Sequence, residues 1–371
     1  MNATIRKLLS AAVVLLADVA PCQGTPLYHL TDLGVLPGDT VSAGLALNAS
    51  GQVTGYGYYL KTTTTPIYSA FLYSGGVIQS IGSSSSGAYI TGNSINDSGQ
   101  IVGESNSGAF LYSGGTLQNM NSLPGIAGSG WTLNSAAGIN NGGQIVGTAI
   151  NSAGTAQAFL YSAETLLELP VLPNQTSSVA VAVNASGQVA GNWGDSRFGP
   201  MQAFSYNNGS TLDLGNLPGQ TTTLAYAIND MGQIVGESGP YPFLYSAAGM
   251  QNLGLFPNSM YSRALGINDS GEMVGDSNLG ALLFLNGAEY NLTNLLDASG
   301  TGWFLTSATA VNNNGVILAI GTDPATDSSH AVLLTPVPEP TTCLLAAVGA
   351  AGVGCWRFRR RRAALGRRPF A

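Results

Sequence analysis

The chain has 371 residues, of which 44% are hydrophobic, 8% are charged and 50 are glycine. A chain rich in aliphatic residues and poor in charge is not intrinsically disordered. Residues 25–340 contain three basic and 18 acidic residues, a net charge of −15, so this region repels nucleic acid and anionic lipid headgroups. A role in nucleic-acid binding is therefore excluded.

The N-terminus predicts a secretory signal peptide at residues 1–24. Two basic residues, Arg6 and Lys7, precede an apolar run from Leu8 to Val19, which is shorter than a membrane span. Cleavage after Gly24 fits, because small residues flank Gln23. The alternative interpretation is a buried N-terminal helix.

One sequence motif, Asn-x-x-Gly-Gln-x-x-Gly with some substitutions in the last copies, recurs along residues 25–335. Successive copies are separated by 48, 44, 44, 45, 39 and 44 residues and begin at Asn48, Asn96, Asn140, Asn184, Asn229, Asn268 and Asn312. A period near 44 residues indicates stacked copies of one supersecondary unit, because no copy can bury its apolar face alone.

The copy around Asn229 shows what we expect of each unit. Residues 224–228 alternate apolar and small side chains, 229–232 form a turn and 233–236 return, which predicts a β-hairpin. A short apolar block follows, as at Ala70–Tyr73, and predicts a third strand buried between sheets. A fourth strand, such as residues 251–254, completes the unit.

Most units are joined by Leu-Pro-Gly or a close relative. These connectors lie at residues 36–38, 123–125, 172–174, 217–219 and 256–258. Proline fixes its own φ and the next Gly or Asn accepts a positive φ, so each connector predicts a type II turn.

Four strands per unit predict an all-β fold, a seven-bladed β-propeller spanning residues 25–335. A parallel β-helix would need a much shorter coil. The seventh unit has three strands before the tail begins, and a lone strand at residues 28–34 stands at the other end of the chain. We expect this N-terminal strand to complete the last blade and close the ring, which would remove open sheet edges.

The repeated apolar block resembles a known bacterial repeat. Its copies include Ala70-Phe71, Ala109-Phe110 and Ala158-Phe159, and they are similar to the HAF-type extracellular repeat, named for this Ala-Phe pair. The resemblance covers about residues 28–335. It implies extracellular placement and no defined activity.

The C-terminus, residues 336–371, has three parts in a fixed order. The motif Val337, Pro338, Glu339, Pro340 precedes an apolar segment at 341–356 and an arginine cluster of Arg357, Arg359, Arg360, Arg361 and Arg362. A helix over 341–356 would be about 24 Å long, short of a ~30 Å hydrocarbon core. The arginines can snorkel and should stay cytoplasmic.

This order resembles the PEP-CTERM sorting signal of Gram-negative bacteria that make exopolysaccharide. The resemblance implies an exosortase, a membrane protease-transpeptidase, as processing partner, with the chain transiently anchored in the inner membrane by the C-terminal helix. Residues 363–371 after the cluster depart from the pattern. A plain single-span anchor is the alternative.

Four groups of residues are candidates for function, and the two histidines are the first. His29 and His330 fall in the proposed closing blade and could meet, with Asp32, as a metal pair or acid–base dyad, although two ligands are few for zinc. The three cysteines lie outside the repeats, so the repeat region has no disulfide framework. Ordinary strand positions are the competing interpretation for both histidines.

Carboxylates recur after the Val-Gly step of the repeat, at Glu104, Glu237 and Asp276. Paired carboxylates around a cleft can hydrolyse glycosides. The same register holds Tyr56, Thr148 and Asn192 in other copies, which favours a consensus position without catalytic meaning.

Two further candidates concern ligands. The Asn-Asp turns beginning at Asn96, Asn229 and Asn268 offer oxygens suited to calcium, although turn chemistry explains them as well. Glycan contacts are expected at Trp131, Trp193 and Trp303, because exposed aromatic rings stack on sugars. Filling of space between blades is the alternative for these tryptophans.

Taken together, these patterns predict an exported cell-surface or extracellular-matrix protein. We expect a non-enzymatic binding or structural component linked to exopolysaccharide or biofilm, with no catalytic residue, no cofactor-binding residue and no metal site assigned. The alternative is an extracellular polysaccharide hydrolase or lyase that uses the rim carboxylates.

Overall fold

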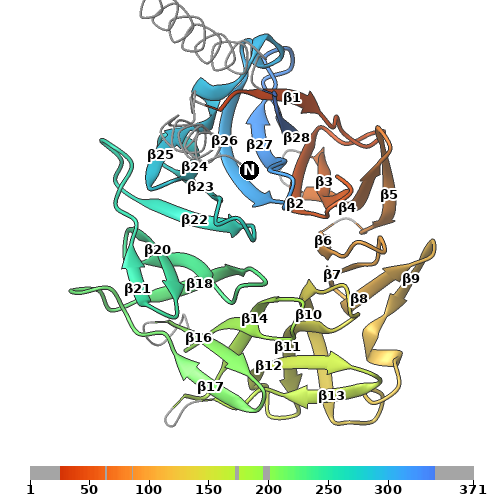
Figure 1. Cartoon of the computed structure of the whole chain (residues 1–371). Coiled ribbons are helices and arrows are strands. Elements are labelled where there is room, and N and C mark those ends of the chain that lie inside the picture. Colours follow the sequence, from red (N-terminus) through yellow and green to blue (C-terminus); the bar gives the residue numbers. More distant parts are fainter. Residues whose placement is uncertain (1–25, 63–64, 86, 172–174, 195–200, 339–371) are drawn as a thin grey trace, which may run out of the picture. The chain divides into compact units, whose positions relative to one another are not determined.

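Short alternating strands, separated by glycine turns, fold Tyr28–Pro336 into a β-propeller (Figure 1). The computed structural model describes residues 26–62, 65–85, 87–171, 175–194 and 201–338. The predicted signal peptide at 1–24 and the predicted apolar helix at 341–356 lie outside these residues. Within the described ranges, no helix has the length and apolarity needed to cross a membrane.

Four of the sheets contain four consecutive antiparallel strands each. The first comprises β2 (Val41–Leu47), β3 (Val53–Thr62), β4 (Thr65–Ser74) and β5 (Val77–Ser83). The others are β14 (Ser178–Val183), β15 (Val189–Trp193), β16 (Gln202–Asn207) and β17 (Ser210–Asp213); β18 (Thr223–Ile228), β19 (Ile234–Ser238), β20 (Tyr241–Ser246) and β21 (Gly249–Asn252); and β22 (Ser262–Ile267), β23 (Met273–Ser277), β24 (Gly280–Leu285) and β25 (Ala288–Asn291).

The closing sheet joins the two ends of the propeller. Its strand order is β1-β28-β27-β26, and its strands are β1 (Tyr28–Asp32), β26 (Phe304–Val311), β27 (Ile317–Thr322) and β28 (Ser329–Pro336). β1 pairs antiparallel with β28, from Tyr28 opposite Pro336 to Asp32 opposite Val332. The N-terminal strand therefore completes the last sheet, as the sequence predicts.

The remaining eight strands form one sheet. They are β6 (Ile90–Ile95), β7 (Ile101–Ser105), β8 (Gly108–Ser113), β9 (Thr116–Asn119), β10 (Trp131–Ile139), β11 (Ile145–Asn151), β12 (Ala156–Ser162) and β13 (Thr165–Glu168). A single pairing, Ser135 with Glu104, joins β10 to β7, and it lies next to a bulge in β10 between Leu133 and Ser135.

The prediction of a seven-bladed propeller is therefore wrong. The propeller has five four-stranded blades, and the second and third repeat units share the eight-stranded sheet instead of forming two separate blades. The physical reason is the contact between Ser135 and Glu104, where neighbouring first and second strands approach closely enough to pair. Such a pairing depends on the local path of β10, which repeat spacing does not encode.

Three short 3-10 helices lie in connectors of the described chain, η1 (Met120–Ser122), η2 (Leu292–Leu295) and η3 (Ala298–Gly300). The Pro connectors adopt the predicted geometry where the structure describes them. Gly38, Gly219 and Asn258 have φ of 95°, 81° and 67°. The connector at 172–174 lies outside the described residues.

The core lies between successive sheets and is built from the apolar third strands. Phe71, Phe159, Phe204 and Phe243 are fully buried there. The Val-Gly step of the second strand provides room for these rings, because a Cβ at Gly236 would come 2.8 Å from Phe243. The glycine of the repeat is thus a packing requirement.

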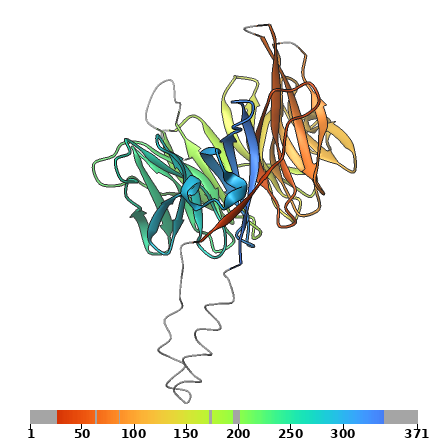
Figure 2. The same ribbon diagram turned by 90° about the horizontal axis from the view of Figure 1, so that it is seen from above.

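The β3–β4 hairpin is longer than its counterparts. Each of its strands has 10 residues, whereas β7 and β8 have five and six. Figure 2 shows this hairpin (brown and orange) extending beyond the neighbouring strands.

Candidate functional site

The asparagines that begin the seven repeat copies form a closed ring of hydrogen bonds. Each Asn Nδ2 donates to the backbone carbonyl of the corresponding Asn in the next copy, at 2.9–3.2 Å. Asn312 closes the ring by donating to the carbonyl of Asn48. All seven side chains are buried, with exposed fractions of 3–8%.

Within its own turn, each asparagine also accepts hydrogen bonds. In one copy, Asn184 Oδ1 accepts from the backbone N–H of Ser186 at 3.2 Å and of Gln188 at 2.9 Å, while Nδ2 reaches Gln188 Oε1 at 3.3 Å. Asparagine suits this position because its amide has both an acceptor and a donor, whereas aspartate lacks the donor. The turn was predictable from the sequence, but the bond to the next copy was not.

A cavity of about 230 Å³ lies at this ring and is lined by residues of all seven copies, the ring asparagines included. The residue after each asparagine is Ala49, Asp97, Asn141, Ala185, Asp230, Asp269 or Asn313. Several of these side chains accept a backbone N–H from the preceding copy, as Asp97 does from Ala49 at 2.9 Å and Asp269 from Asp230 at 2.8 Å.

The calcium hypothesis concerns these same turns. Among the described residues, no three His, Cys, Asp or Glu side chains are grouped so that they could hold a metal ion. Asp97, Asp230 and Asp269 instead accept hydrogen bonds from neighbouring turns. Calcium binding stays a prediction without a ligand set.

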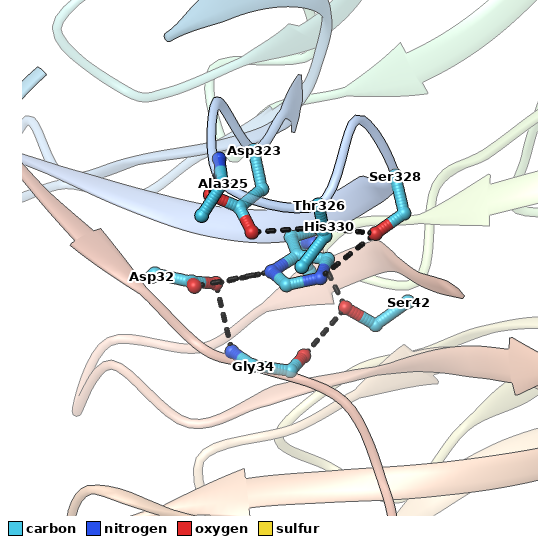
Figure 3. Close-up of polar contacts among 9 residues, drawn as sticks. Asp32, Gly34, Ser42, Asp323, Ala325, Thr326, Ser328 and His330 are labelled. Atoms are coloured by element: carbon cyan, nitrogen blue, oxygen red, sulfur yellow. Dashed lines mark hydrogen bonds and ion pairs between the residues drawn. The ribbon is translucent and has the colours of Figure 1, made fainter. Parts of the chain in front are cut away.

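The two histidines lie in the closing sheet but do not meet. His29 contacts Asp297, whereas His330 Nδ1 lies 3.1 Å from both carboxylate oxygens of Asp32 (Figure 3). Because β1 and β28 are antiparallel, His29 sits opposite Thr335, at the other end of β28 from His330. His330 therefore lies beside Asp32, as the sequence suggested, but the two histidines are not in contact.

A serine extends the His330 contact on its other side. Ser328 Oγ lies 3.4 Å from His330 Nε2 and 2.6 Å from Thr326 Oγ1 (Figure 3). The order Asp32–His330–Ser328 is that of a catalytic triad, but the nucleophile-to-base distance exceeds the usual 2.6–3.2 Å. His330 is only 8% exposed. These contacts favour a structural tie between β1 and β28.

Ser42 extends the tie to the first sheet. Its hydroxyl donates to the carbonyl of Gly34 at 2.6 Å (Figure 3). It also accepts the backbone N–H of Ala331 at 3.0 Å. Ser42 belongs to β2 and is fully buried. The first and last sheets are thus joined by a buried hydroxyl as well as by the asparagine ring.

The three recurring carboxylates, Glu104, Glu237 and Asp276, occupy equivalent positions on β7, β19 and β23, and other described side chains engage the last two. Glu237 accepts the Tyr226 hydroxyl at 2.8 Å. Asp276 is buried and forms a bidentate ion pair with Arg263, at 2.8 Å to both Nε and Nη2. This hydrogen-bonded pair raises the pKa of Arg263, and burial with nearby Glu237 raises the pKa of Tyr226.

The three tryptophans occupy different environments. Trp193 is 1% exposed and stacks on Phe204 at 5.0 Å between ring centroids, so it cannot contact a glycan in this structure. Trp131 and Trp303 are partly buried, each against a different core cluster. Of the predicted glycan contacts, only Trp131 and Trp303 retain accessible surface.

The comparisons with known proteins identify the tail and the fold. Residues 336–362 match the PEP-CTERM protein-sorting motif, which exosortase recognises and which implies export to the cell surface or beyond. The match covers the tail alone, so the HAF-type resemblance of residues 28–335 stays a prediction. No curated protein matches the sequence.

Solved structures similar to this chain share its β-propeller fold at low identity. One is the extracellular domain of a one-component system from B. thetaiotaomicron, with 10% identity, a TM-score of 0.51, and 83% of this chain and 40% of that chain covered. Another is a puromycin-hydrolysing peptidase of Mycobacterium tuberculosis, with 9% identity, a TM-score of 0.51, and 84% and 56% covered. This chain spans about two fifths and just over half of their lengths, and the similarity shows the fold alone.

Proposed function

We propose that this chain is a non-enzymatic polysaccharide-binding protein of the cell surface or extracellular matrix. The observation that carries the proposal is the sorting motif, which starts at residue 336, where the last propeller strand ends. An exosortase-type enzyme is the processing partner that this motif implies. The link to exopolysaccharide rests on the bacteria in which such signals occur.

Binding is favoured over catalysis by the state of the rim carboxylates. Asp276 is held by Arg263 and Glu237 by Tyr226, so neither is an unengaged acid or base. A hydrolase or lyase would need two carboxylates free to face one substrate bond. The described structure offers no specific observation in favour of that alternative.

The export half of the proposal is tested by changing the motif. Replacing Pro338 and Pro340 together by alanine should prevent processing, so that the full-length chain accumulates in the membrane fraction of the producing cells. The matched control is Pro324→Ala, in an exposed loop of the propeller. Equal surface or extracellular yield and equal size of the two variants would contradict the assignment.

The binding half is tested by presenting the full-length protein, in detergent, to panels of neutral and acidic polysaccharides. We expect retention on at least one polysaccharide and no release of reducing ends on prolonged incubation. If the protein binds none of the polysaccharides, the proposed function is overturned. Steady release of oligosaccharides would favour the hydrolase or lyase.

A further inference from the structure

The first repeat unit differs from the others in two places that lie together. It contains the long β3–β4 hairpin, and its spacing to the next copy, 48 residues, is the largest in the chain. The connector from β5 to β6 contacts that hairpin, because Ser84 Oγ accepts the backbone N–H of Tyr68 at 3.0 Å and the Ser84 N–H donates to the Tyr68 carbonyl at 2.8 Å.

A cavity of about 290 Å³ lies at this connector. Its walls are formed by the connector, the β7–β8 turn and the end of β9, and they include Ser85, Tyr89, Asn106, Ser107, Leu117 and Asn119. Phe110, which is 2% exposed, also lines it. The volume is close to the lower limit of about 300 Å³ for small-molecule sites, which suits a short ligand.

The lining combines an apolar side with free hydrogen-bonding groups. Asn106 uses its Oδ1 to accept the backbone N–H of Tyr89 at 2.6 Å, which leaves its Nδ2 without a protein partner among the described residues. The side-chain hydroxyls of Ser85, Ser107 and Tyr89 form no hydrogen bond with any described residue. These groups can donate to and accept from a ligand rich in hydroxyls.

Tyr89 provides an aromatic face that its equivalents do not. The only other tyrosine at this repeat position is Tyr261, and both are 36% exposed. The guanidinium of Arg263 lies 5.5 Å from the centroid of the Tyr261 ring. In the unit that contains Tyr89, the residue equivalent to Arg263 is Thr91, whose hydroxyl donates to Asn93 Oδ1. Among the described residues, no cation lies over the Tyr89 ring, so this ring can stack on a sugar.

The absence of charge from the pocket selects among ligands. No Asp, Glu, Lys or Arg is among its lining residues in the described chain. Residues 25–340 carry a net charge of −15. Burial raises the pKa of Tyr89, and the nearby negative charge of Glu104 raises it further. An anionic sugar would meet repulsion here, with no cation among the described lining residues to offset it.

We propose that this pocket binds a neutral sugar unit, stacked on Tyr89 and hydrogen-bonded by Asn106, Ser85 and Ser107. The inference rests on the proposed polysaccharide-binding function and adds its location and the chemical class of the ligand. The pocket joins the first unit to the second, so the site depends on what differs between repeat copies.

The test measures binding of the full-length protein to neutral and acidic glycan arrays, followed by titration with the best neutral ligand. Tyr89→Ala should weaken neutral-glycan binding by roughly tenfold or more, as loss of a central aromatic contact does. Asn106→Asp keeps the Oδ1 acceptor for Tyr89 and removes the free amide donor, so it should weaken binding without disturbing the turn.

Matched controls are Tyr261→Ala and Asn278→Asp, because Asn278 accepts the backbone N–H of Met260 as Asn106 accepts that of Tyr89. Both controls should bind like the unmodified chain. Neutral-glycan binding that survives Tyr89→Ala and Asn106→Asp would overturn this site and leave the proposed function standing. Binding of acidic glycans alone would overturn the ligand class, and binding of none would overturn the proposed function itself.

Discussion

The asparagine that begins each repeat copy links two neighbouring units. Asn229 accepts the N–H of Gln233 at 2.9 Å, donates to Gln233 Oε1 at 2.8 Å and donates to the Asn268 carbonyl at 3.0 Å. We predict that Asn229→Ala lowers the free energy of unfolding by about 2–4 kcal/mol, because it leaves buried donors and acceptors unpaired. Urea denaturation measures the loss.

The control for that prediction lies in the same turn. Met231 is 73% exposed where four other copies have serine, so Met231→Ser should change stability by less than about 0.5 kcal/mol. Equal effects of the two changes would show that the asparagine ring contributes nothing beyond the turn.

Asp39 makes stability depend on pH. Burial raises its pKa to about 6, a hydrogen bond with Ser69 opposing the rise, and Oδ2 has no hydrogen-bond partner in the described structure. The unfolded chain has a carboxyl pKa of about 3.9. The folded state therefore holds the proton more tightly, so this contribution is complete below pH ~4 and is lost as the pH rises through about 6.

We predict that Asp39→Asn removes this decline and stabilises the protein at pH 7–8 by up to about 3 kcal/mol. Thermal midpoints measured from pH 4 to 8 test it. Asp213→Asn, at an exposed position, serves as the control and should leave the profile unchanged. A parallel decline in the Asp39→Asn protein would contradict the assignment.

At the level of single residues, the sequence predicts what a residue does within its own segment. The turn role of Asn229 and the positive φ of Gly38 follow from neighbouring residues, and both are present. The burial of Trp193 and the bond from Asn229 to Asn268 depend on another unit's position. Local patterns do not contain that position.

β1 is the strand that closes the propeller. Tyr28 and Leu30 are 3% and 6% exposed and pack in the core of the closing sheet. We predict that removing Tyr28–Asp32 lowers the thermal midpoint by roughly 5 °C or more, because two apolar side chains lose their burial and β28 becomes an open edge. Differential scanning calorimetry measures the shift.

The control uses the opposite face of the same strand. The His29 side chain is 56% exposed, so His29→Ala should leave the midpoint nearly unchanged. A shift from strand removal no larger than that from His29→Ala would refute the closing role of β1.

The elements themselves were largely predictable, whereas their grouping into sheets was not. The hairpin at Leu224–Ile228 and 233–236 corresponds to β18 and β19, and the apolar blocks are third strands, because periodicity and turn residues act locally. The eight-stranded sheet instead arises from one pairing of Ser135 with Glu104. Glu104 and Ser135 are 31 positions apart in the sequence, and the 44-residue repeat pattern does not indicate that they pair.

At the scale of the whole molecule, closure should make the propeller unfold as one unit. An open array of repeats unfolds in steps because each repeat contacts only its neighbours. Here Asn312 hydrogen-bonds to Asn48, Ser42 hydrogen-bonds to Ala331, and β1 pairs with β28. The unfolding of any one sheet would therefore break contacts with the sheets on both sides of it. We predict coincident unfolding transitions throughout residues 28–336.

Three tryptophans allow this to be measured, because Trp131 and Trp193 lie in β10 and β15 and Trp303 immediately precedes β26. Variants that keep one of these three and have phenylalanine at the other tryptophan positions each report on a different sheet. Their fluorescence transitions in urea should share one midpoint after correction for each variant's stability, and far-UV circular dichroism should follow the same curve. Separate midpoints for Trp193 and Trp303 would mean that the sheets unfold independently and that the bonds between the first and last units do not hold the ring closed.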